Sequence, residues 1–584
     1  MNNKEFLNEV KKKAQLWLGD NFDEQTRQEV KELLDAEDST PLIEAFYKDL
    51  EFGTGGLRGI MGAGTNRMNR YTVAMATQGL SNYLRKAFAD KDEIKVVIGH
   101  DCRNNSEFFS RIAAETFAAN GIRVYLFDAL RPTPEISFAI RYLGCQSGVM
   151  ITASHNPKEY NGYKAYWEDG AQLLSPHDIN TIEEVSKIKT PLDIKQDKHP
   201  DLIEEIGADI DDLFIEKVTS LSLSPEQVKK NSQMPIVYTP IHGAGIRMVP
   251  RALNAFGFEN IIGVPEQYVV SGDFPTVISP NPEEPAALEL AIRRADETGA
   301  DLVLASDPDG DRLGVAIRNN DGVMQLINGN QICMLLTYYS IIRRKELGLL
   351  TEKDYVVKTI VTTELIKAIA KKEGVRLFDS YTGFKWIAAI IRENENKLRY
   401  IGGGEESFGF LWEDFIRDKS SVSACCLFAE LYAWALEKGL SIFELLDKIA
   451  LEYGVYEDKG LNLVRKGRSG AEEIQEMMRQ YRSTPIESLA GSPVVKTLDY
   501  QNLTEKDIRT GEIKSIDMPA KSNVLQFVAE DGSKLSIRPS GTEPKIKYYI
   551  CIHENVSSPE YLAKAKETAK TRIQNVIDDL HLPL

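Results

Sequence analysis

The sequence GVMITASHNP at residues 148–157 decides the fold. Its first four residues are apolar, as at the end of a buried strand, and Pro157 excludes a simple helix through the polar part. Ser154 is therefore expected on a loop at the carboxyl end of a strand, where α/β sheets place their chemistry. A serine hydroxyl becomes a nucleophile when a base or a metal activates it, and His155 and Lys164 are close in sequence. A lone Ser-His pair is more typical of a polar turn, so the interpretation depends on other loops.

The composition is that of an acidic globular protein. Of the 584 residues, 42% are hydrophobic and 27% are charged, so a large core can form and disorder is not expected. At about 100–200 residues per domain, this length predicts about three to five domains. The net charge of -17 argues against nucleic acid and anionic membranes as partners, since both bind basic surfaces. An anionic substrate would need a locally basic pocket.

The cysteines and the N-terminal residues favour a reducing cytoplasm as the location. The six cysteines form no CxxC pair and no disulfide-like spacing. Residues 1–18 mix charged and apolar residues and lack the continuous apolar segment of a signal peptide. No run approaches about 20 uninterrupted apolar residues, so no transmembrane helix is expected.

Strands alternate with helices along most of the chain, which predicts βαβ units and mostly parallel sheets. Three such units, following a charged helical extension of about 48 residues, each end a strand in a polar loop. Beyond them, Asp531-Gly532 marks a hairpin in a smaller antiparallel α+β domain, and residues 451–480, rich in Gly, Lys and Glu, are expected to form a linker. The expected fold class is α/β, with domains at 1–205, 206–325, 326–455 and 456–584.

Three aspartates at alternate positions follow the predicted strand Leu302–Ala305: they are Asp307, Asp309 and Asp311. Carboxylates this close repel one another unless a cation joins them, and hard oxygen ligands suit Mg²⁺. The spacing is not that of an EF-hand, because Arg312 occupies the sixth position and the twelfth is also an arginine. An acidic solvated turn is the alternative, and the preceding buried strand favours the metal site.

A second polar loop, Arg538–Pro544, is suited to a phosphate monoester. It offers a guanidinium, two hydroxyls and free backbone N–H groups on Arg538, Ser540, Gly541 and Thr542. A surface turn between strands is the alternative.

Three further loops give weaker signals. Glu405 and Ser407 lie on a glycine-rich turn and could accept hydrogen bonds from sugar hydroxyls. The turn at 382–385 ends in a lysine that could reach an anion or cap a helix, and Arg58 lies in a glycine-dense loop that could approach phosphate. Ordinary turns would explain each of these as well.

The combination of Thr152–Pro157, Asp307–Arg312, Gly404–Gly409 and Arg538–Pro544, in this order over nearly the whole chain, resembles the α-D-phosphohexomutase superfamily. The segment Ala153–Gln172 is similar to phosphoglucomutases of the longer, phosphopentomutase-like branch. The resemblance implies three related α/β/α domains with mixed, mostly parallel sheets and a smaller C-terminal α+β domain around a central cleft.

The resemblance also implies roles for the candidate residues. Ser154 would carry a phosphoryl group, and one Mg²⁺ per subunit would be held by a phosphoserine oxygen and the three aspartates. Lys164 or His155 would be the general acid/base, and we expect neighbouring arginines to push the lysine pKa towards neutral. Arg58 and Arg312 would take part in catalysis. Glu405 and Ser407 would bind sugar hydroxyls, and Thr382 and Lys385 would bind an anionic group. The phosphate that is not transferred would be held by Arg538, Ser540, Gly541 and Thr542.

The function that follows is interconversion of α-D-glucose 1-phosphate and glucose 6-phosphate through glucose 1,6-bisphosphate, by a monomer or homodimer. A phosphopentomutase, a phosphomannomutase or a bisphosphate synthase on the same fold are the nearest alternatives. Of these, mannose activity is less expected, because the loop reads Gly-Glu-Glu-Ser-Phe-Gly at 404–409. A metal-dependent phosphatase and a silent sugar-phosphate binding protein are alternatives of other classes.

Overall fold

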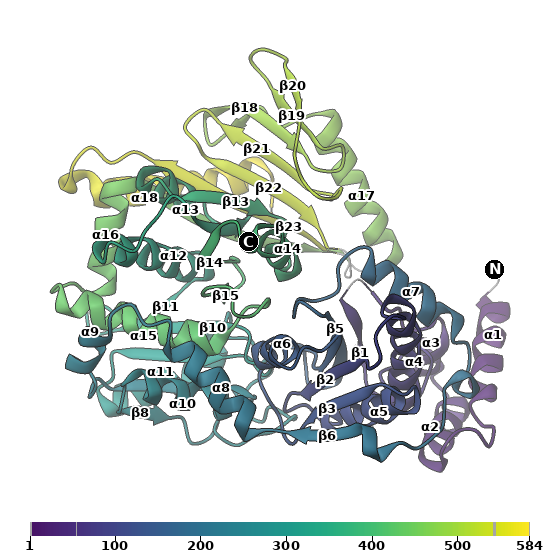
Figure 1. Ribbon diagram of the computed structural model, residues 1–584. Coiled ribbons are helices and arrows are strands. Elements are labelled where there is room, and N and C mark those ends of the chain that lie inside the picture. The colour runs from purple at the N-terminus through teal and green to yellow at the C-terminus, as the bar shows by residue number, and fades with distance from the viewer. Residues whose placement is uncertain (1–2, 54, 466, 541–544, 583–584) are drawn as a thin grey trace. The chain divides into compact units, whose positions relative to one another are not determined.

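The computed structural model describes residues 3–53, 55–465, 467–540 and 545–582 (Figure 1). The chain forms two compact units. The first consists of Met1–Gly329, Ala388–Glu395 and Ser407–Trp434, and the second of Asn330–Ile387, Asn396–Glu406 and Ala435–Leu584.

The N-terminal extension is helical, as the sequence predicted. It comprises α1 (Asn3–Leu16), α2 (Glu24–Asp35) and α3 (Thr40–Phe46), drawn in purple in Figure 1. Its aromatic residues Trp17, Phe22 and Phe46 pack with Tyr71, the second residue of α4 (Arg70–Ala87). The Tyr71 hydroxyl donates to Asp23 Oδ2 at 2.8 Å. The extension is thus fixed to the first α/β domain by burial and by this hydrogen bond.

The first sheet is mixed. Four of its strands are parallel, and β5 and β1 extend the sheet in antiparallel orientation. Arg58, expected on a loop, lies on β1, which pairs antiparallel with β5. Lys164 lies on β5, because the chain returns to the sheet directly after the serine loop as a strand antiparallel to β4. The strands in sheet order are β1 (Gly56–Ile60), β5 (Tyr160–Trp167), β4 (Ser147–Ile151), β2 (Lys95–His100), β3 (Arg123–Phe127) and β6 (Ile203–Ile206), and the helices are α4, α5 (Ser106–Ala119), α6 (Thr133–Tyr142) and α7 (His177–Lys187).

The second sheet has the same mixed character. Its central strand β9 is fully buried and ends at Ser306, directly before the aspartate loop. The strands in sheet order are β11 (Met324–Ile327), β10 (Leu313–Arg318), β9 (Leu302–Ser306), β7 (Ile236–Thr239) and β8 (Ile261–Gly263), and the helices of this region are α8 (Ala208–Thr219), α9 (Pro225–Lys230), α10 (Gly245–Phe256) and α11 (Pro285–Thr298).

A third group of strands belongs to the second unit. The strands β13, β12 and β14 are parallel neighbours. The apolar run at 424–435 is buried and forms part of α15. The elements of this region of the sequence are α12 (Gly329–Glu346), β12 (Asp354–Thr359), α13 (Leu365–Glu373), β13 (Arg376–Ser380), α14 (Phe384–Asn394), β14 (Arg399–Gly404), β15 (Phe410–Leu411), α15 (Ser421–Glu437) and α16 (Ile442–Tyr453).

The C-terminal domain is one antiparallel sheet with two helices. The predicted linker at 451–480 is wrong: it contains the end of α16, the ten-residue β16 and most of α17. Its charged residues lie on an edge strand in which only Val455 and Leu463 are buried, and on the helix α17. The strands in sheet order are β16 (Val455–Val464), β23 (Lys545–Glu554), β22 (Lys534–Pro539), β21 (Leu525–Ala529), β18 (Ser492–Asp499), β19 (Thr504–Asp507) and β20 (Ile513–Ser515), β17 (Ser488–Leu489) pairs with β18, and the helices are α17 (Gly467–Ser483) and α18 (Leu562–Asp579).

Within the second unit, this sheet packs on the loop that follows β12. The side chain of Gln526 donates to the carbonyl of Ile360 at 2.7 Å, and Lys534 Nζ donates to the same oxygen at 2.8 Å. Tyr381 donates from its hydroxyl to the carbonyl of Ala520 at 2.6 Å. Because the buried amide and ammonium groups must find hydrogen-bond partners, they fix how the sheet packs on this loop.

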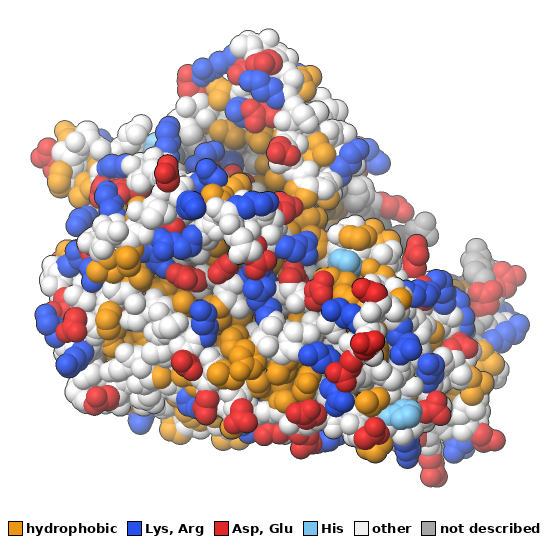
Figure 2. All heavy atoms as spheres, in the orientation of Figure 1, with side chains coloured by type: hydrophobic (Ala, Val, Ile, Leu, Met, Phe, Trp, Pro, Cys, Tyr) orange, Lys and Arg blue, Asp and Glu red, His pale blue; other side chains and the backbone are white. Residues whose placement is uncertain are grey.

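The surface matches the composition. Basic and acidic side chains are interspersed over the face drawn in Figure 2. Among the residues that the structure describes, no helix combines the length and apolar character needed to cross a bilayer.

Candidate active site

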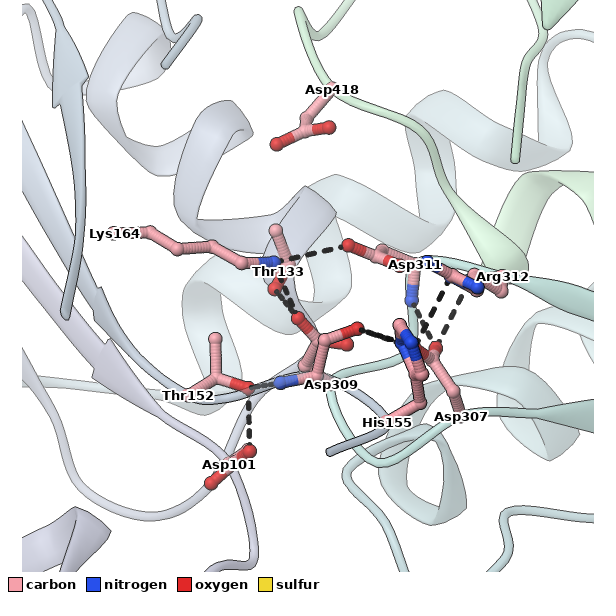
Figure 3. Close-up of polar contacts among 12 residues, drawn as sticks. Asp101, Thr133, Thr152, His155, Lys164, Asp307, Asp309, Asp311, Arg312 and Asp418 are labelled. Atoms are coloured by element: carbon pink, nitrogen blue, oxygen red, sulfur yellow. Dashed lines mark hydrogen bonds and ion pairs between the residues drawn. The ribbon is translucent and has the colours of Figure 1, made fainter. Parts of the chain in front are cut away.

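The serine loop begins where β4 ends. Ser154 is buried and adopts a left-handed backbone conformation, with φ of 52°. For a residue with a side chain this conformation costs about 1–3 kcal/mol, so the surroundings must enforce it. The Ser154 N–H donates to Thr152 Oγ1 at 2.8 Å. That hydroxyl donates to Asp101 Oδ2 at 2.6 Å (Figure 3). The serine is thus held by a chain of hydrogen bonds from Asp101, directly after the neighbouring parallel strand β2.

Arg103 anchors the rest of the loop. Its side chain is fully buried, and its guanidinium donates to the carbonyls of Ser154 at 2.6 Å and Asn156 at 2.5 Å. It also donates to the carbonyls of Pro157 and Tyr160, at 2.9 and 3.0 Å. Arg103 Nε lies 3.4 Å from Asp101 Oδ2. One side chain therefore satisfies four loop carbonyls and pairs with the carboxylate at the end of that chain of hydrogen bonds.

The aspartate loop follows β9 in the same way. Asp307, Asp309 and Asp311 are buried, and one carboxylate oxygen of each lies within 4.8 Å of the others. Gly310 has φ of 64°, and a Cβ there would lie 2.7 Å from the Cβ of Pro132, so the tight turn and the close approach both require glycine.

Two lysines neutralise part of this charge. Lys164 Nζ lies 2.7 Å from Asp309 Oδ2 and 3.2 Å from Asp311 Oδ2, and Lys419 Nζ lies 2.6 Å from Asp311 Oδ2. Burial alone would lower the pKa of Lys164, but Asp309 and Asp311 outweigh it and raise that pKa. The expectation of a lowered lysine pKa is therefore wrong for this arrangement, since carboxylates rather than arginines are its nearest charged neighbours.

The carboxylate pKa values are split by the same contacts. Burial and the repulsion of the other two carboxylates raise the pKa of Asp307 well above its usual value. Burial also acts to raise the pKa of Asp309, but the charges of Lys164 and Lys419 override it and lower that pKa. A buried group of three carboxylates that repel one another is a site that favours an added cation.

The hydrogen bonds of the aspartates leave room for that cation. Asp307 Oδ1 accepts the backbone N–H groups of Asp311 and Arg312, both at 3.1 Å. Among the described residues, Asp309 Oδ1 and Asp311 Oδ1 are buried without a hydrogen-bond partner. Such orphaned anionic oxygens are costly, and hard carboxylate oxygens are the ligands that Mg²⁺ prefers. The residues present therefore fit a divalent cation.

The structure brings Ser154 to this cluster. Ser154 Oγ donates to Asp307 Oδ2 at 3.0 Å and lies 3.3 Å from His155 Nδ1. Burial, with the nearby charges of Arg312 and Arg58, lowers the pKa of His155 to about 2, so the imidazole is neutral. Ser154, His155, Lys164 and the three aspartates, which the sequence assigned to one site, thus lie together.

The two arginines of the predicted catalytic set belong to the same unit. Arg312 donates to Glu283 Oε1 at 2.6 Å and has its Nε 4.0 Å from Asp307 Oδ2. Arg58 is exposed and donates to Asn156 Oδ1 at 3.3 Å, so it borders the serine loop. Both supply positive charge beside the serine and the aspartates.

The predicted substrate residues divide between the units. In the second unit, Glu405 Oε1 accepts the N–H of Gly383 at 2.8 Å, which joins the Glu405 loop to the bend at Thr382 and Gly383. Lys385, expected on the same turn, is instead the second residue of α14, because the helix begins at Phe384. Ser407 belongs to the first unit.

The predicted phosphate loop is described in part. Arg538 is on β22, and its Nε is buried without a hydrogen-bond partner among the described residues. Ser540 donates its N–H to the carbonyl of Lys545 at 2.8 Å. Gly541 and Thr542 lie outside the described residues.

Three family models match the chain in succession. They are Phosphoglucomutase/phosphomannomutase, alpha/beta/alpha domain I at residues 49–191, domain II at 212–322 and domain III at 328–453. The chain belongs to this family. It is therefore a member of the α-D-phosphohexomutase superfamily and a mutase, a class of isomerase. The expected fold class, three α/β/α domains with mixed sheets and a β-rich C-terminal domain, is confirmed, while the exact domain limits stay predictions.

Relatives of two activities are equally similar to this phosphohexomutase. It is 34% identical over 535 residues to a phosphoglucomutase of Staphylococcus haemolyticus, covering 90% of this chain and 95% of the relative. It is 34% identical over 579 residues to a probable phosphoribomutase of Schizosaccharomyces pombe, covering 95% and 96%. A human phosphopentomutase is 33% identical over 567 residues, covering 94% and 92%.

Solved structures show the same fold. A phosphoglucomutase of Paramecium, parafusin, aligns with a TM-score of 0.67 at 19% identity, covering 91% of this chain and 95% of that one. A putative phosphomannomutase of Thermus thermophilus aligns with a TM-score of 0.63 at 20% identity, covering 90% and 99%.

The sequence interpretation missed several residues of the mutase site. Asp101 and Arg103 follow β2, the parallel neighbour of β4, so their position at the same edge of the sheet was a usable signal. The sequence around Thr133 and around Lys419 has no comparable signal. Each reaches the aspartates only through tertiary packing.

Proposed function

We propose that this mutase interconverts α-D-glucose 1-phosphate and glucose 6-phosphate through a phosphoserine at Ser154 and a glucose 1,6-bisphosphate intermediate. The observation that carries the proposal is the contact of Ser154 Oγ with Asp307 Oδ2 at 3.0 Å. It joins a buried nucleophile to a cluster of anionic oxygens, two of which have no partner among the described residues.

In this proposal Asp307, Asp309, Asp311 and the phosphorylated Ser154 hold one Mg²⁺. When bound, Mg²⁺ neutralises charge that develops on the transferring phosphoryl group. The unpartnered Oδ1 atoms of Asp309 and Asp311 support this assignment.

The chemistry consists of two phosphoryl transfers. In the first, the bond between phosphorus and Ser154 Oγ breaks, a bond to O6 of glucose 1-phosphate forms, and the O6 proton leaves. The bisphosphate then turns over, its O1 phosphoryl group passes to Ser154 Oγ, and O1 receives a proton as glucose 6-phosphate forms. No water is consumed, so the phosphate count on enzyme and sugar is unchanged.

The side chains near Ser154 suit alignment and proton transfer. Lys164, protonated in the observed arrangement, can hold a proton at Nζ for an oxygen that becomes negative, and neutral His155 offers Nδ1 at 3.3 Å from Ser154 Oγ. Arg58 and Arg312 supply positive charge for the anionic substrate in a protein of net charge -17.

Recognition of the sugar phosphate is assigned to the remaining loops. Glu405 and Ser407 would accept hydrogen bonds from sugar hydroxyls, and Thr382 and Lys385 would lie near an anionic group. The phosphate that is not transferred would be held by Arg538, Ser540, Gly541 and Thr542. A cytoplasmic location and a monomeric or homodimeric state belong to the same proposal.

A phosphopentomutase is the second candidate, because the human phosphopentomutase and the S. pombe phosphoribomutase are as similar as the phosphoglucomutase. A phosphomannomutase uses a related substrate and is tested by the same assay, whereas a bisphosphate synthase would need an added phosphoryl donor and is tested by net bisphosphate formation in its presence.

The experiment is a substrate panel. Glucose, mannose and ribose 1-phosphates are each incubated with the enzyme, Mg²⁺ and a trace of glucose 1,6-bisphosphate, and products and inorganic phosphate are quantified. We expect glucose 6-phosphate to form fastest, with no inorganic phosphate released, and Ser154→Ala to be inactive. Faster conversion of the pentose phosphate would move the assignment to a phosphopentomutase, and stoichiometric phosphate release would contradict the mutase mechanism.

A further inference from the structure

Thr133 contacts the aspartate loop from outside the loop's own domain. It is the first residue of α6 and is fully buried. Its backbone N–H donates to the carbonyl of Asp309 at 2.8 Å, and its hydroxyl donates to Asp309 Oδ2 at 3.0 Å (Figure 3). One residue therefore fixes both the backbone and the carboxylate of Asp309.

The two oxygens of Asp309 have different surroundings. Oδ2 accepts from Thr133 and from Lys164, which lies 2.7 Å away, whereas Oδ1 has no hydrogen-bond partner among the described residues. A carboxylate can rotate about its Cβ–Cγ bond, and two donors on one oxygen restrict that rotation. The Lys164 ammonium group also contacts Asp311, whereas the Thr133 hydroxyl donates to Asp309.

The first turn of α6 is itself fixed. The Arg131 side chain is buried and donates from Nε to Asp211 Oδ1 at 2.6 Å, and its backbone N–H donates to the carbonyl of His100 at 3.0 Å. Pro132 lies so close to Gly310 that no Cβ fits between them. The Thr133 hydroxyl thus projects from a backbone with little freedom to move.

We propose that Thr133 is a positioning residue for the divalent cation: it orients Asp309 so that Oδ1 faces the cation. This rests on the metal assignment made under the proposed function. Thr133 acts through Asp309, as outer partners of metal ligands commonly do, and their removal typically weakens metal binding by about 10–100-fold.

The test measures cation binding rather than turnover. Mn²⁺ is titrated into the full-length protein and free Mn²⁺ is followed by electron paramagnetic resonance, with preparations matched for Ser154 phosphorylation by intact mass. Thr133→Val removes the hydroxyl at nearly constant shape, and Thr133→Ser keeps the hydroxyl and removes the methyl. The matched control is Thr116→Val, which removes a buried hydroxyl that donates to the helix carbonyl of Ile112 on α5.

We expect the Mn²⁺ dissociation constant to rise about tenfold or more in Thr133→Val and to stay within about threefold of wild type in Thr133→Ser and Thr116→Val. Equal affinity of Thr133→Val and wild type would overturn the inference, as would equal losses in the Val and Ser variants, which would indicate packing by the methyl group. If Thr133→Val does not fold, as judged by circular dichroism, Thr133→Ser alone still tests the inference. A tenfold rise in its Mn²⁺ dissociation constant would contradict the role of the hydroxyl, because serine keeps that hydroxyl. Absence of a stoichiometric Mn²⁺ site in wild type would instead refute the metal assignment itself.

Discussion

Replacement of Arg103 by Met should both destabilise the first unit and slow turnover. The substitution keeps an apolar stem of similar length and removes every guanidinium hydrogen bond. Because Arg103 donates to four carbonyls between Ser154 and Tyr160, the serine loop loses its main anchor. The strained φ of 52° at Ser154 would then relax.

The expected magnitude follows from the burial of the ion pair. Both side chains of the Arg103–Asp101 pair are fully buried, and removing one partner of such a pair costs about 3–5 kcal/mol. The carbonyls at Asn156 and Tyr160 belong to partly exposed residues, so water can satisfy them and they add little. Displacement of Ser154 by about 1 Å would lower turnover by about 100-fold.

The assay is urea unfolding followed by circular dichroism, together with the mutase rate in the folded baseline. The matched control is Arg111→Met on α5, where the exposed arginine pairs with Glu107 at 3.4 Å and an effect below about 1 kcal/mol is expected. If Arg103→Met unfolds within 1 kcal/mol of wild type and turns over within twofold, the anchoring role assigned to Arg103 is wrong.

Three further predictions concern charge and metal. Asp309→Ala should reduce turnover at least about a thousandfold while leaving the far-ultraviolet circular dichroism spectrum unchanged, since it removes a proposed cation ligand from a loop; substantial residual turnover would count against the metal site. Mg²⁺ at about 100 times its dissociation constant should stabilise wild type by about 2.7 kcal/mol and Asp309→Ala much less, as measured by thermal unfolding with and without a chelator; equal shifts would show that the ion acts elsewhere. Burial raises the pKa of Asp458 to about 6, so the folded protein binds this proton more tightly than the unfolded chain, and a stabilisation of up to about 3 kcal/mol present near pH 4 is lost as the pH rises through 6. Urea unfolding between pH 4.5 and 7.5 should show this slope reduced in Asp458→Asn, and parallel profiles for the two proteins would exclude the assignment.

The parts of the fold that follow local rules could be predicted from the sequence. The helix Pro285–Thr298 and the strand ending at Ser306 have clear start and stop signals, with Gly299 in the left-handed conformation that ends helices. The segment 451–480 could not be predicted, because the ten pairs of β16 are all made with β23, which lies about 80 residues later in sequence. Its charged composition indicated exposure, which an edge strand and a surface helix share with a linker.

The candidate site was predictable where chemistry is concentrated in one loop. Ser154 and the three aspartates each follow a buried strand, so their residue types and positions agree. The direction in which the pKa of Lys164 is shifted was not predictable, because it depends on which charges lie nearest in space. Lys419 and Thr133 reach the aspartates from residues more than 100 positions away, which no local pattern reports.

Intact-mass spectrometry determines directly whether Ser154 carries the phosphoryl group. Wild type and Ser154→Ala are incubated with glucose 1,6-bisphosphate and Mg²⁺. The intact mass of each protein is measured before and after addition of glucose 1-phosphate. We expect a wild-type species heavier by one phosphoryl group, absent from Ser154→Ala. A wild-type protein that never gains this mass, or a variant that gains it equally, would contradict the phosphoserine mechanism.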